Sequence, residues 1–339
     1  MRGSLRSKNI ENISNLHAIN RVKMDIALFG RAMGQESYPE LGLLLQRLKT
    51  DRKVRLFFYE PFYNYLIKSI KQTQSKISGS GAILNALDGA GLFFSADDMP
   101  QTTELFLSLG GDGTFLNGVA LVRDRNIPIA GINFGRLGFL TTAKVSDKNT
   151  EPNSFQSNEW IDKLLSKDFC TERRSLLKME YEGTPADFYP CALNEITVQR
   201  SGTAMLDLEI SINGSPLPHY LADGVVISSS TGSTAYALSV GGPIVLPNSN
   251  VLVIVPIAPH NLNIRPLVVP DSSVISVAFE TRYKDAIVSA DNRFFNVPNG
   301  TCIKVSKGEN SVGVVSMDNN FIRALNEKLF WGADKRNLK

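Results

Sequence analysis

The residues with the clearest chemical potential are Gly110-Gly111-Asp112-Gly113, which follow the apolar run 105–109 and precede helix-compatible residues 114–125. This order is typical of a strand, a tight glycine turn and a helix start. Glycine lets a ligand approach the backbone closely, and the N–H groups at a helix start attract phosphate. A carboxylate in that turn suits holding a metal ion or accepting a proton from a hydroxyl. An ordinary Gly-Asp-Gly turn explains the stretch equally well.

A second polar string lies further along the chain, at Thr231-Gly232-Ser233-Thr234-Ala235-Tyr236. Its hydroxyl and N–H donors suit phosphate or ribose, because they donate without bringing charge, and Tyr236 offers a flat surface to a base. Apolar strands flank the string and Gly241-Gly242-Pro243 closes it, which favours this interpretation over a solvated loop. Asn194-Glu195 offers an amide and a carboxylate to sugar hydroxyls, although a structural turn is nearly as good an explanation.

The composition excludes several classes of protein. A chain of 339 residues suits two domains, and 43% apolar with 20% charged residues is typical of a globular protein with buried cores. A net charge of +3 is too small to indicate nucleic acid as a partner, and no apolar run approaches the length of a membrane span. The three separated cysteines indicate a reducing compartment, and we expect a cytoplasmic protein. The polar residues 1–23 lack the apolar segment of a signal peptide, so we interpret them as an N-terminal extension or a vector remnant.

The first part of the chain alternates strands and helices. Strands are predicted at 24–29, 53–59, 92–94, 105–109 and 127–133, with helices between several of them. Residues 72–90, rich in Ser, Gly and Lys, are expected to form a surface connection. The alternation predicts a Rossmann-like α/β domain with a parallel sheet. In such sheets ligands bind at the carboxyl ends of the strands, which is where the Asp112 turn lies.

From residue 176 onward the pattern changes to short strands separated by turns, such as the hairpin signal Asn213-Gly214. We therefore predict a β-rich, β-sandwich-like second domain, preceded by a linker at 146–157. The amphipathic residues 320–329 predict a helix that packs back on the first domain. The predicted domains are 24–145 with the returning segment 317–339, and 146–316.

Several motifs in order resemble the NAD kinase (ATP-NAD kinase) family. They are Gly110–Leu116, Gly131–Leu140, Ala192–Glu195, Asp223-Gly224, Thr231–Tyr236, Val255–His260 and Arg265–Val268. The resemblance runs from about residue 24 to Trp331-Gly-Ala-Asp334. The GGDG turn also occurs in lipid kinases, but its combination with the Asn-Glu pair and the TGSTAY loop is specific. The resemblance implies transfer of a phosphoryl group from ATP to the adenosine 2′-hydroxyl of NAD, giving NADP, with a divalent metal ion such as Mg²⁺.

The resemblance also implies a role for each matching residue. Asp112 is the implied proton acceptor, and the resemblance also allows it a part in placing Mg²⁺ through the triphosphate. The implied nucleotide-binding residues are Gly110, Gly111 and Gly113 for phosphate, Phe139 and Leu140 for adenine, Asn194 and Glu195 for the adenosine ribose, and Asp223, Thr231, Thr234, Ala235, Tyr236, Ser239, Ile257 and His260 for the rest of the dinucleotide. Part of the family's pocket comes from a second subunit, which implies a homodimer or homotetramer with shared active sites. Neither nucleic acid nor a membrane is implied as a partner.

Three departures from the family pattern stand out. Ser229-Ser230 occupies the place of a Thr-Pro pair, and Leu221 stands where relatives often carry an arginine, which leaves the choice between NAD and NADH open. The Asp-Gly-Gln segment of relatives reads Asp291-Asn292-Arg293, so only Asp291 is carried over.

Two alternative functions are weighed against this one. A lipid kinase of the diacylglycerol or sphingosine type shares the GGDG turn, but it needs an apolar, membrane-facing entry that the sequence does not provide. A sensor that binds NADP without turnover would fit a chain in which Asp112 is replaced, and Asp112 is present.

Overall fold

The computed structural model describes residues 24–51, 53–72, 77–134, 138–141, 143–144, 159–316 and 320–329. The N-terminal extension, the predicted linker 146–157, residues 135–137 and the Trp331–Asp334 segment lie outside these ranges. The chain divides into two compact units: unit 1 lies within Met1–Leu28 and Gly34–Leu105, and unit 2 within Phe29–Met33 and Phe106–Lys339. The boundary predicted between 145 and 146 stays a prediction.

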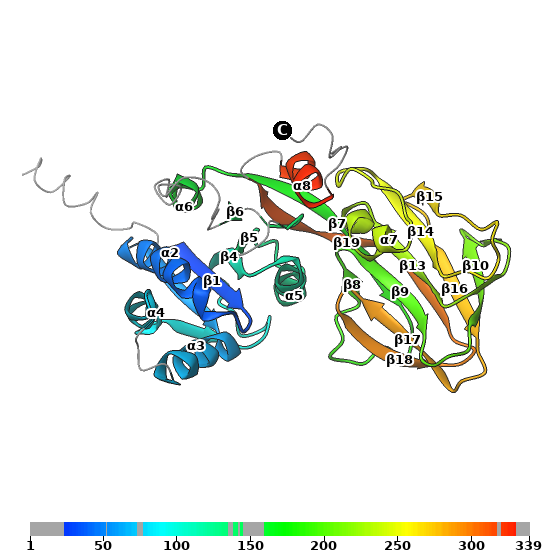
Figure 1. Cartoon of the computed structure of the whole chain (residues 1–339), viewed down its shortest axis with the longest axis horizontal. Coiled ribbons are helices and arrows are strands. Elements are labelled where there is room, and N and C mark those ends of the chain that lie inside the picture. Colours follow the sequence, from blue (N-terminus) through cyan, green and yellow to red (C-terminus); the bar gives the residue numbers. More distant parts are fainter. Residues whose placement is uncertain are drawn as a thin grey trace, which may run out of the picture. The chain divides into compact units, whose positions relative to one another are not determined.

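Unit 1 is an α/β unit with parallel strands (Figure 1). Its strands are β1 (Met24–Gly30), β2 (Val54–Tyr59) and β3 (Gly91–Phe93), paired in parallel in that order. Its helices are η1 (Gln35–Ser37), α2 (Tyr38–Thr50), α3 (Glu60–Gln72) and α4 (Ser80–Leu87). Residues of β1 are buried throughout, as expected for a strand covered on both faces. The predicted alternation of strands and helices is confirmed here.

Helix α4 corrects the expectation that residues 72–90 form only a surface connection. Its apolar residues Ile83, Ala86 and Leu87 recur at helical spacing and are buried. Gly79 precedes the helix with φ +87°, and a side chain there would lie 2.2 Å from the carbonyl oxygen of Tyr38. The prediction relied on the Ser and Gly content of the segment and therefore overlooked this short apolar pattern.

A buried charge in unit 1 is fully paired within the fold. The Asp25 side chain is completely buried and accepts hydrogen bonds from Arg55 Nε and Nη2 at 2.6 and 2.5 Å, and from the Thr102 hydroxyl. A buried carboxylate needs such partners. This cluster therefore has a structural explanation.

The α/β part of unit 2 carries the glycine turn. Strand β4 (Thr103–Leu109) runs into unit 2 and pairs in parallel with β5 (Ile129–Asn133), which also pairs with β6 (Ala143–Lys144) and with the end of β19 (Cys302–Ser316). Helix α5 (Asp112–Val122) follows β4 directly, beginning two residues earlier than expected. The predicted strand, glycine turn and helix are thus confirmed.

The rest of unit 2 is β-rich, with two mainly antiparallel sheets. One sheet has the order β15-β14-β13-β9-β17-β18, and the other joins β11, β10, β16 and β19, with β12 on β10, β7 on β19 and β8 on β7. The bounds are β7 (Cys170–Glu180), β8 (Cys191–Ala192), β9 (Glu195–Arg200), β10 (Leu206–Ile212), β11 (Ser215–Pro216), β12 (Tyr220–Ala222), β13 (Gly224–Ser229), β14 (Val251–Ile257), β15 (Leu267–Pro270), β16 (Ile275–Glu280), β17 (Asp285–Ala290) and β18 (Arg293–Pro298).

The two sheets enclose one apolar core. Val198 and Val225 of the first sheet belong to the same buried cluster as Leu208 and Val277 of the second. Such alternating inward-facing residues are typical of a sandwich. The predicted β-sandwich-like domain is confirmed.

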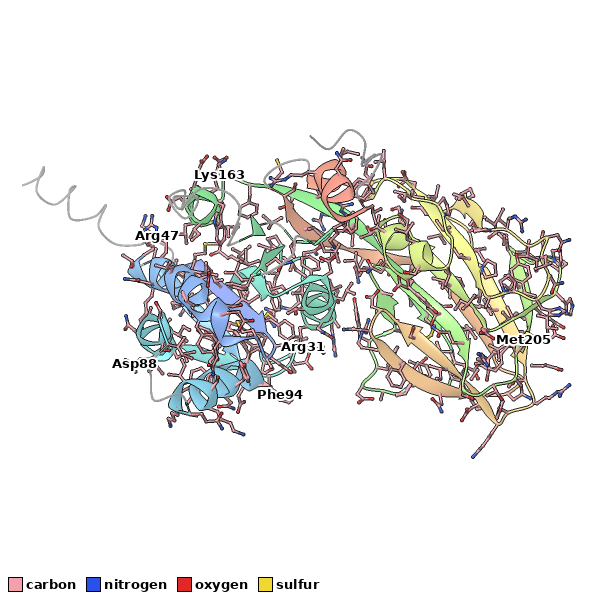
Figure 2. All side chains as sticks on the ribbon, viewed as in Figure 1. Arg31, Arg47, Asp88, Phe94, Lys163 and Met205 are labelled. Atoms are coloured by element: carbon pink, nitrogen blue, oxygen red, sulfur yellow. The ribbon has the colours of Figure 1, made fainter. Side chains whose placement is uncertain are left out.

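Unit 2 also contains short helices, namely α6 (Glu159–Ser166), η3 (Thr231–Thr234), α7 (Tyr236–Ser239) and the C-terminal α8 (Asn320–Leu329). Helix α8 buries Ala324 and Leu325, and its Phe321 ring lies 6.0 Å from the ring of Phe139. The predicted return of this helix to the α/β part is confirmed. No helix in the described part of the chain is long and apolar enough to cross a membrane. Large exposed apolar side chains such as Phe94 and Met205 are scattered (Figure 2), which is ordinary for a protein surface.

Candidate active site

The glycine turn between β4 and α5 leaves open space for a ligand. Gly110 has φ +150°, and a side chain there would lie 2.5 Å from the Thr114 hydroxyl, so this position favours glycine. Side chains added at Gly111 or Gly113 would meet no atom within 4 Å. The first N–H groups of a helix have no acceptor within it. The turn therefore presents backbone donors beside open space, as a phosphate site requires.

The Asp112 carboxylate is held by its surroundings at the first position of α5. Its Oδ2 and Oδ1 accept hydrogen bonds from the N–H groups of Phe139 (3.0 Å) and Leu140 (3.1 Å). A side chain on Gly138 would lie 1.9 Å from Asp112 Oδ1, so the backbone can approach only because this residue is glycine. The chain after β5 thus holds Asp112 in one orientation.

A lysine of the C-terminal helix completes the surroundings of Asp112. Lys328 Nζ lies 3.2 Å from Asp112 Oδ2, with both side chains about 30% exposed, and 4.5 Å from the centre of the Phe139 ring. Sequence reasoning missed Lys328, which is 216 positions from Asp112 and carries no local signal for this contact. Its ammonium places a positive charge beside Asp112 and the glycine turn.

Asn194 and Glu195 lie at the start of β9 with unsatisfied polar atoms. Both residues are buried, yet Asn194 Oδ1 and Glu195 Oε2 have no hydrogen-bond partner among the described residues. Burial, and then the charge of Asp291, raises the pKa of Glu195 to about 8, against a lowering by the Tyr236 N–H. Buried polar atoms without partners are costly, so this pair is suited to receive a polar ligand.

The Thr231–Tyr236 loop packs against this pair. A side chain on Gly232 would lie 2.1 Å from the backbone oxygen of Asn194, so the loop approaches through its glycine. Ser229 Oγ donates to the Leu193 carbonyl (2.6 Å) and accepts from the Gly232 N–H (3.1 Å), while Ser230 Oγ donates to Pro247 (2.8 Å). Ser229 and Ser230, which replace the Thr-Pro pair, thus tie the loop to its neighbours.

Several hydroxyls of this string serve the fold. Ser233 Oγ donates to the Val245 carbonyl at 3.1 Å and accepts from the Val245 N–H at 3.0 Å, and Thr234 Oγ1 donates to the Thr231 carbonyl at 3.4 Å. The structure places Thr231 and Thr234 in η3 and Tyr236 and Ser239 in α7, with Ala235 between the two helices. Their predicted contacts with a dinucleotide stay a prediction.

Asp223, Ile257 and His260 form a separate group at the other end of β13. The Asp223 N–H donates to Ile257 (2.9 Å), and the His260 N–H donates to Leu221 (2.7 Å). Arg200 Nε lies 2.8 Å from Asp223 Oδ1, with both side chains about one-third exposed. Sequence reasoning missed Arg200, which the strand pairing alone places here.

The pairing register fixes how far apart these two groups are. Gly224 lies opposite Ile257 and Gln199, whereas Ser228 lies opposite Glu195. At about 3.3 Å per residue, β13 separates Asp223 from Ser229, two residues before Thr231, by roughly 20 Å. Within one chain, the Asp223 group and the Glu195–Thr231 group therefore lie at opposite ends of this strand.

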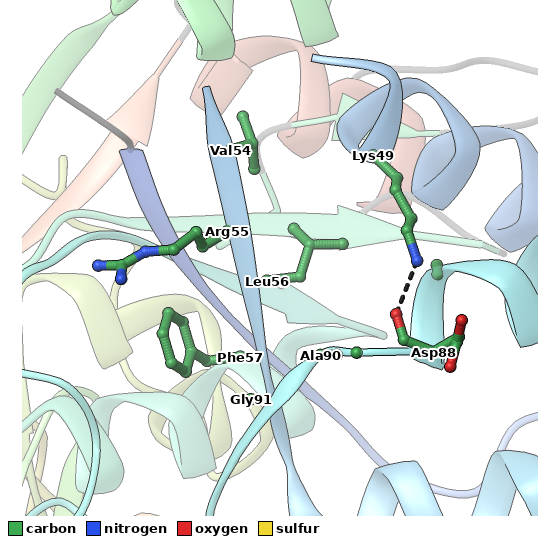
Figure 3. Close-up of a pocket in the computed structure, with 10 residues that line it drawn as sticks. Lys49, Val54, Arg55, Leu56, Phe57, Asp88, Ala90 and Gly91 are labelled. Carbon is green, nitrogen blue, oxygen red and sulfur yellow. Dashed lines mark hydrogen bonds between the residues drawn. The ribbon is translucent and has the colours of Figure 1, made fainter. Parts of the chain in front are cut away.

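A hollow in unit 1 contains none of the predicted site residues (Figure 3). It has a volume of about 310 Å³ and is lined by residues of β2 and of the segment 86–91, together with Lys49. The Lys49 ammonium donates to the backbone oxygen of Asp88 at 2.7 Å. The lysine is thus used by the fold, and we assign this hollow no function.

A carboxylate at an open phosphate turn and a buried amide–carboxylate pair are the chemistry of a phosphotransferase that acts on a hydroxyl. Comparison with known proteins identifies the family within this class. Residues 94–156 match the sequence model of the ATP-NAD kinase N-terminal domain, and residues 193–317 match that of the C-terminal domain. The chain belongs to the ATP-NAD kinase family.

Individual relatives agree with this assignment. The chain is 38% identical over 320 residues to an NAD kinase of Flavobacterium psychrophilum and 40% identical over 318 residues to one of Flavobacterium johnsoniae, covering 93% of this chain and 100% of each relative. A yeast NADH kinase complexed with NADH shares the fold, with a TM-score of 0.75 and 23% identity over 94% of this chain and 91% of its own. An NAD kinase from Archaeoglobus fulgidus in complex with ATP has a TM-score of 0.63 at 25% identity, covering 90% and 98%.

Proposed function

We propose that this protein transfers the γ-phosphoryl group of ATP to the adenosine 2′-hydroxyl of NAD and so produces NADP. The observation that carries the proposal is the Asp112 carboxylate, held at the start of α5 beside the open positions Gly111 and Gly113. Membership of the ATP-NAD kinase family is the basis for proposing ATP and NAD as the two substrates. It supports neither the lipid kinase nor the sensor alternative.

In this mechanism, each group of residues has a separate task. Asp112 accepts the proton of the 2′-hydroxyl, which makes the oxygen a better nucleophile. The N–H groups of Gly111 and Gly113 hold phosphate oxygens, whereas that of Gly110, also predicted for phosphate, donates to the Ile132 carbonyl at 2.8 Å. The Lys328 ammonium stabilises negative charge beside them. Asn194 and Glu195 bind the ribose hydroxyls through polar atoms that have no hydrogen-bond partner within the described ranges of the chain. The ribose is thereby oriented toward Asp112.

A divalent metal ion such as Mg²⁺ is part of the proposal. No cluster of three or more His, Cys, Asp or Glu side chains suited to a metal occurs among the described residues. Mg²⁺ in kinases is held mainly by substrate phosphates and one or two carboxylates, so Asp112 fits as its protein ligand through the bound triphosphate. When bound, the ion neutralises charge on the triphosphate.

We also propose a homo-oligomer, a dimer or tetramer, in which each active site is shared. The support is the separation of about 20 Å between the Asp223 end and the Thr231 end of β13, estimated from strand rise. A partner subunit could bring its Asp223 end next to the Glu195 end of this chain. Closed symmetric assemblies are the usual way to share a site.

The proposal also covers where the protein is located in the cell and whether the acceptor is NAD or NADH. The three cysteines are unpaired, which supports a cytoplasmic location. Leu221 is 37% exposed on β12, where the family pattern led us to expect an arginine. Both NAD and NADH should therefore be compared as acceptors.

Purified protein incubated with ATP, Mg²⁺ and NAD tests the reaction. We expect equimolar NADP and ADP, with phosphorus NMR placing the new phosphate on the adenosine 2′-oxygen. ATP consumption without NADP, or phosphate at another position, would refute the proposal. NADH in a parallel reaction measures the acceptor preference.

A further inference from the structure

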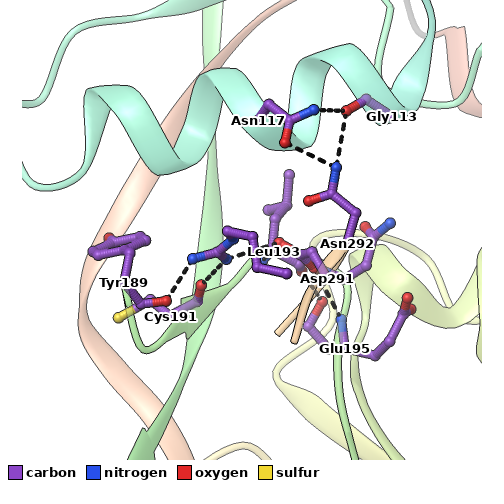
Figure 4. Close-up of polar contacts among 11 residues, drawn as sticks. Gly113, Asn117, Tyr189, Cys191, Leu193, Glu195, Asp291 and Asn292 are labelled. Atoms are coloured by element: carbon purple, nitrogen blue, oxygen red, sulfur yellow. Dashed lines mark hydrogen bonds and ion pairs between the residues drawn. The ribbon is translucent and has the colours of Figure 1, made fainter. Parts of the chain in front are cut away.

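Three consecutive residues, Asp291 and Asn292 of the turn after β17 and Arg293 at the start of β18, reach three different parts of the site region (Figure 4). Asp291 contacts the backbone of 193–195, Asn292 contacts α5, and Arg293 contacts the backbone before 193. Sequence reasoning carried over Asp291 alone and gave Asn292 and Arg293 no role.

Asp291 fixes the backbone that carries Asn194 and Glu195. Its side chain is completely buried and accepts hydrogen bonds from the N–H groups of Leu193 (2.9 Å), Asn194 (2.8 Å) and Glu195 (3.3 Å). Its own N–H donates to the Glu195 carbonyl at 2.9 Å. Asp291 has φ +53°, an uncommon value for a residue with a side chain. Three of these four hydrogen bonds join Asp291 to the predicted acceptor-binding pair, and the fourth holds Leu193 directly before it.

Arg293 holds the segment just before that pair. It donates from Nη2 to the Cys191 carbonyl (2.6 Å) and from Nη1 to the Tyr189 carbonyl, and Nη2 lies 3.9 Å from Asp291 Oδ2. The buried carboxylate therefore has a cation nearby as well as backbone donors. The segment 189–195 is bound to the turn along its length.

Asn292 faces the other way and contacts the helix that begins with Asp112. Its Nδ2 donates to Asn117 Oδ1 at 2.9 Å and lies 3.5 Å from the Gly113 carbonyl oxygen. Asn117 in turn donates to that Gly113 carbonyl at 2.8 Å. These contacts reach the first turn of α5, where Asp112 and the phosphate donors lie.

We propose that the Asp291-Asn292-Arg293 turn is a positioning element that sets the acceptor-binding pair Asn194-Glu195 against Asp112 of α5. The inference rests on the proposed function and names the residues that align its two halves. Transfer between a ribose hydroxyl and a triphosphate is sensitive to displacements of about 1 Å, which can cost roughly 100-fold in rate. A turn bound to both halves limits such displacements.

Asn292 allows positioning to be separated from folding, because it is exposed and contacts α5 only through its side-chain amide, at Asn117 and Gly113. Asn292→Ala should leave the melting temperature and the NAD dissociation constant unchanged, since the Asp291 contacts with 193–195 remain. Turnover at saturating substrates should fall about 10-fold, because the hydroxyl and Asp112 are less well aligned. A purely structural turn would not lower kcat while sparing affinity and stability.

A matched control lies on the same hairpin. Asn296 is also exposed, and its Nδ2 donates to Asp285 Oδ2 at 3.2 Å. Asn296→Ala should leave kcat, KM and the melting temperature unchanged. Asn117→Ala removes the other partner of the contact, and the double variant with Asn292→Ala should be no slower than the slower single variant.

The outcomes distinguish this inference from the proposed function. If the wild type forms NADP and Asn292→Ala has the same kcat as Asn296→Ala, the positioning role is refuted and the proposed function stands. If the fall in kcat of the double variant equals the product of the falls in the two single variants, the positioning role is also refuted, because Asn117 and Asn292 would then act separately. A wild type that does not phosphorylate NAD refutes both.

Discussion

Mixed oligomers offer a quantitative test of the shared site. Asp112 and Asp223 belong to groups that one chain places apart, so each site would take Asp112 from one subunit and Asp223 from its partner. Asp112→Asn removes the proton acceptor while keeping its size. Asp223→Ala removes a carboxylate that is about one-third exposed and pairs with Arg200. Each variant alone should form an oligomer with little activity.

The expected rescue follows from counting sites. In a dimer of one Asp112→Asn chain and one Asp223→Ala chain, one site receives both altered residues and the other receives both intact residues. Pure heterodimers should therefore have about half of the wild-type activity, and a random equal mixture about a quarter. If each chain formed its own site, every site would retain one defect and no rescue would occur.

Co-expression with two different tags and tandem purification isolates the heterodimers, and native mass spectrometry verifies their composition. NADP formation per subunit is then compared with the wild type and with each parent variant. Verified heterodimers without rescue, or an active monomer in light scattering, would contradict the shared site.

Two further substitutions test single residues. Glu195→Gln should weaken NAD binding and lower turnover, since the ribose is less well oriented, and calorimetry with steady-state assays measures both. Burial raises the pKa of Glu195 from 4.5 to about 8, so the stability of the wild type falls as the pH rises from about 5 to 8. Glu195→Gln should therefore raise Tm more at pH 8 than at pH 5. An equal gain in Tm at pH 5 and pH 8 would contradict the argument that burial raises this pKa. Lys328→Met should lower turnover about 10-fold with little change in Tm, since an ion pair exposed by about 30% contributes at most about 1 kcal/mol. Lys178→Met, which alters an exposed ion pair on β7, is its control, and equal turnover in the two variants would exclude a role for Lys328 in transfer.

Local patterns carried much of the fold prediction. The turn at Asp112 was predictable because an apolar strand, consecutive glycines and helix-compatible residues follow one another directly. The Asn213-Gly214 hairpin was predictable because its signal also lies in adjacent residues, and both residues adopt positive φ. The short helix α4 was missed because its three buried apolar positions lie in a segment dominated by small and polar residues.

The arrangement of the site depended on contacts between distant parts of the chain. No spacing in the sequence links Lys328 to Asp112 or Asn292 to Asn117, because these contacts arise from how α8 and the β17–β18 turn pack. The strand 224–229 was predicted, but the register that places Glu195 at one end and Ile257 at the other is a property of the sheet. Motif matching therefore identified the residues without showing that they form separate groups.

The most direct test of the account is the effect of Asp112→Asn on phosphoryl transfer. The amide keeps the size of the side chain but cannot accept the hydroxyl proton at neutral pH. With ATP and NAD both saturating, turnover should fall roughly 10²- to 10⁴-fold, while the NAD dissociation constant measured by calorimetry stays within a few-fold of the wild type. Turnover within a few-fold of the wild type in the purified variant would contradict the assignment of Asp112 as the proton acceptor.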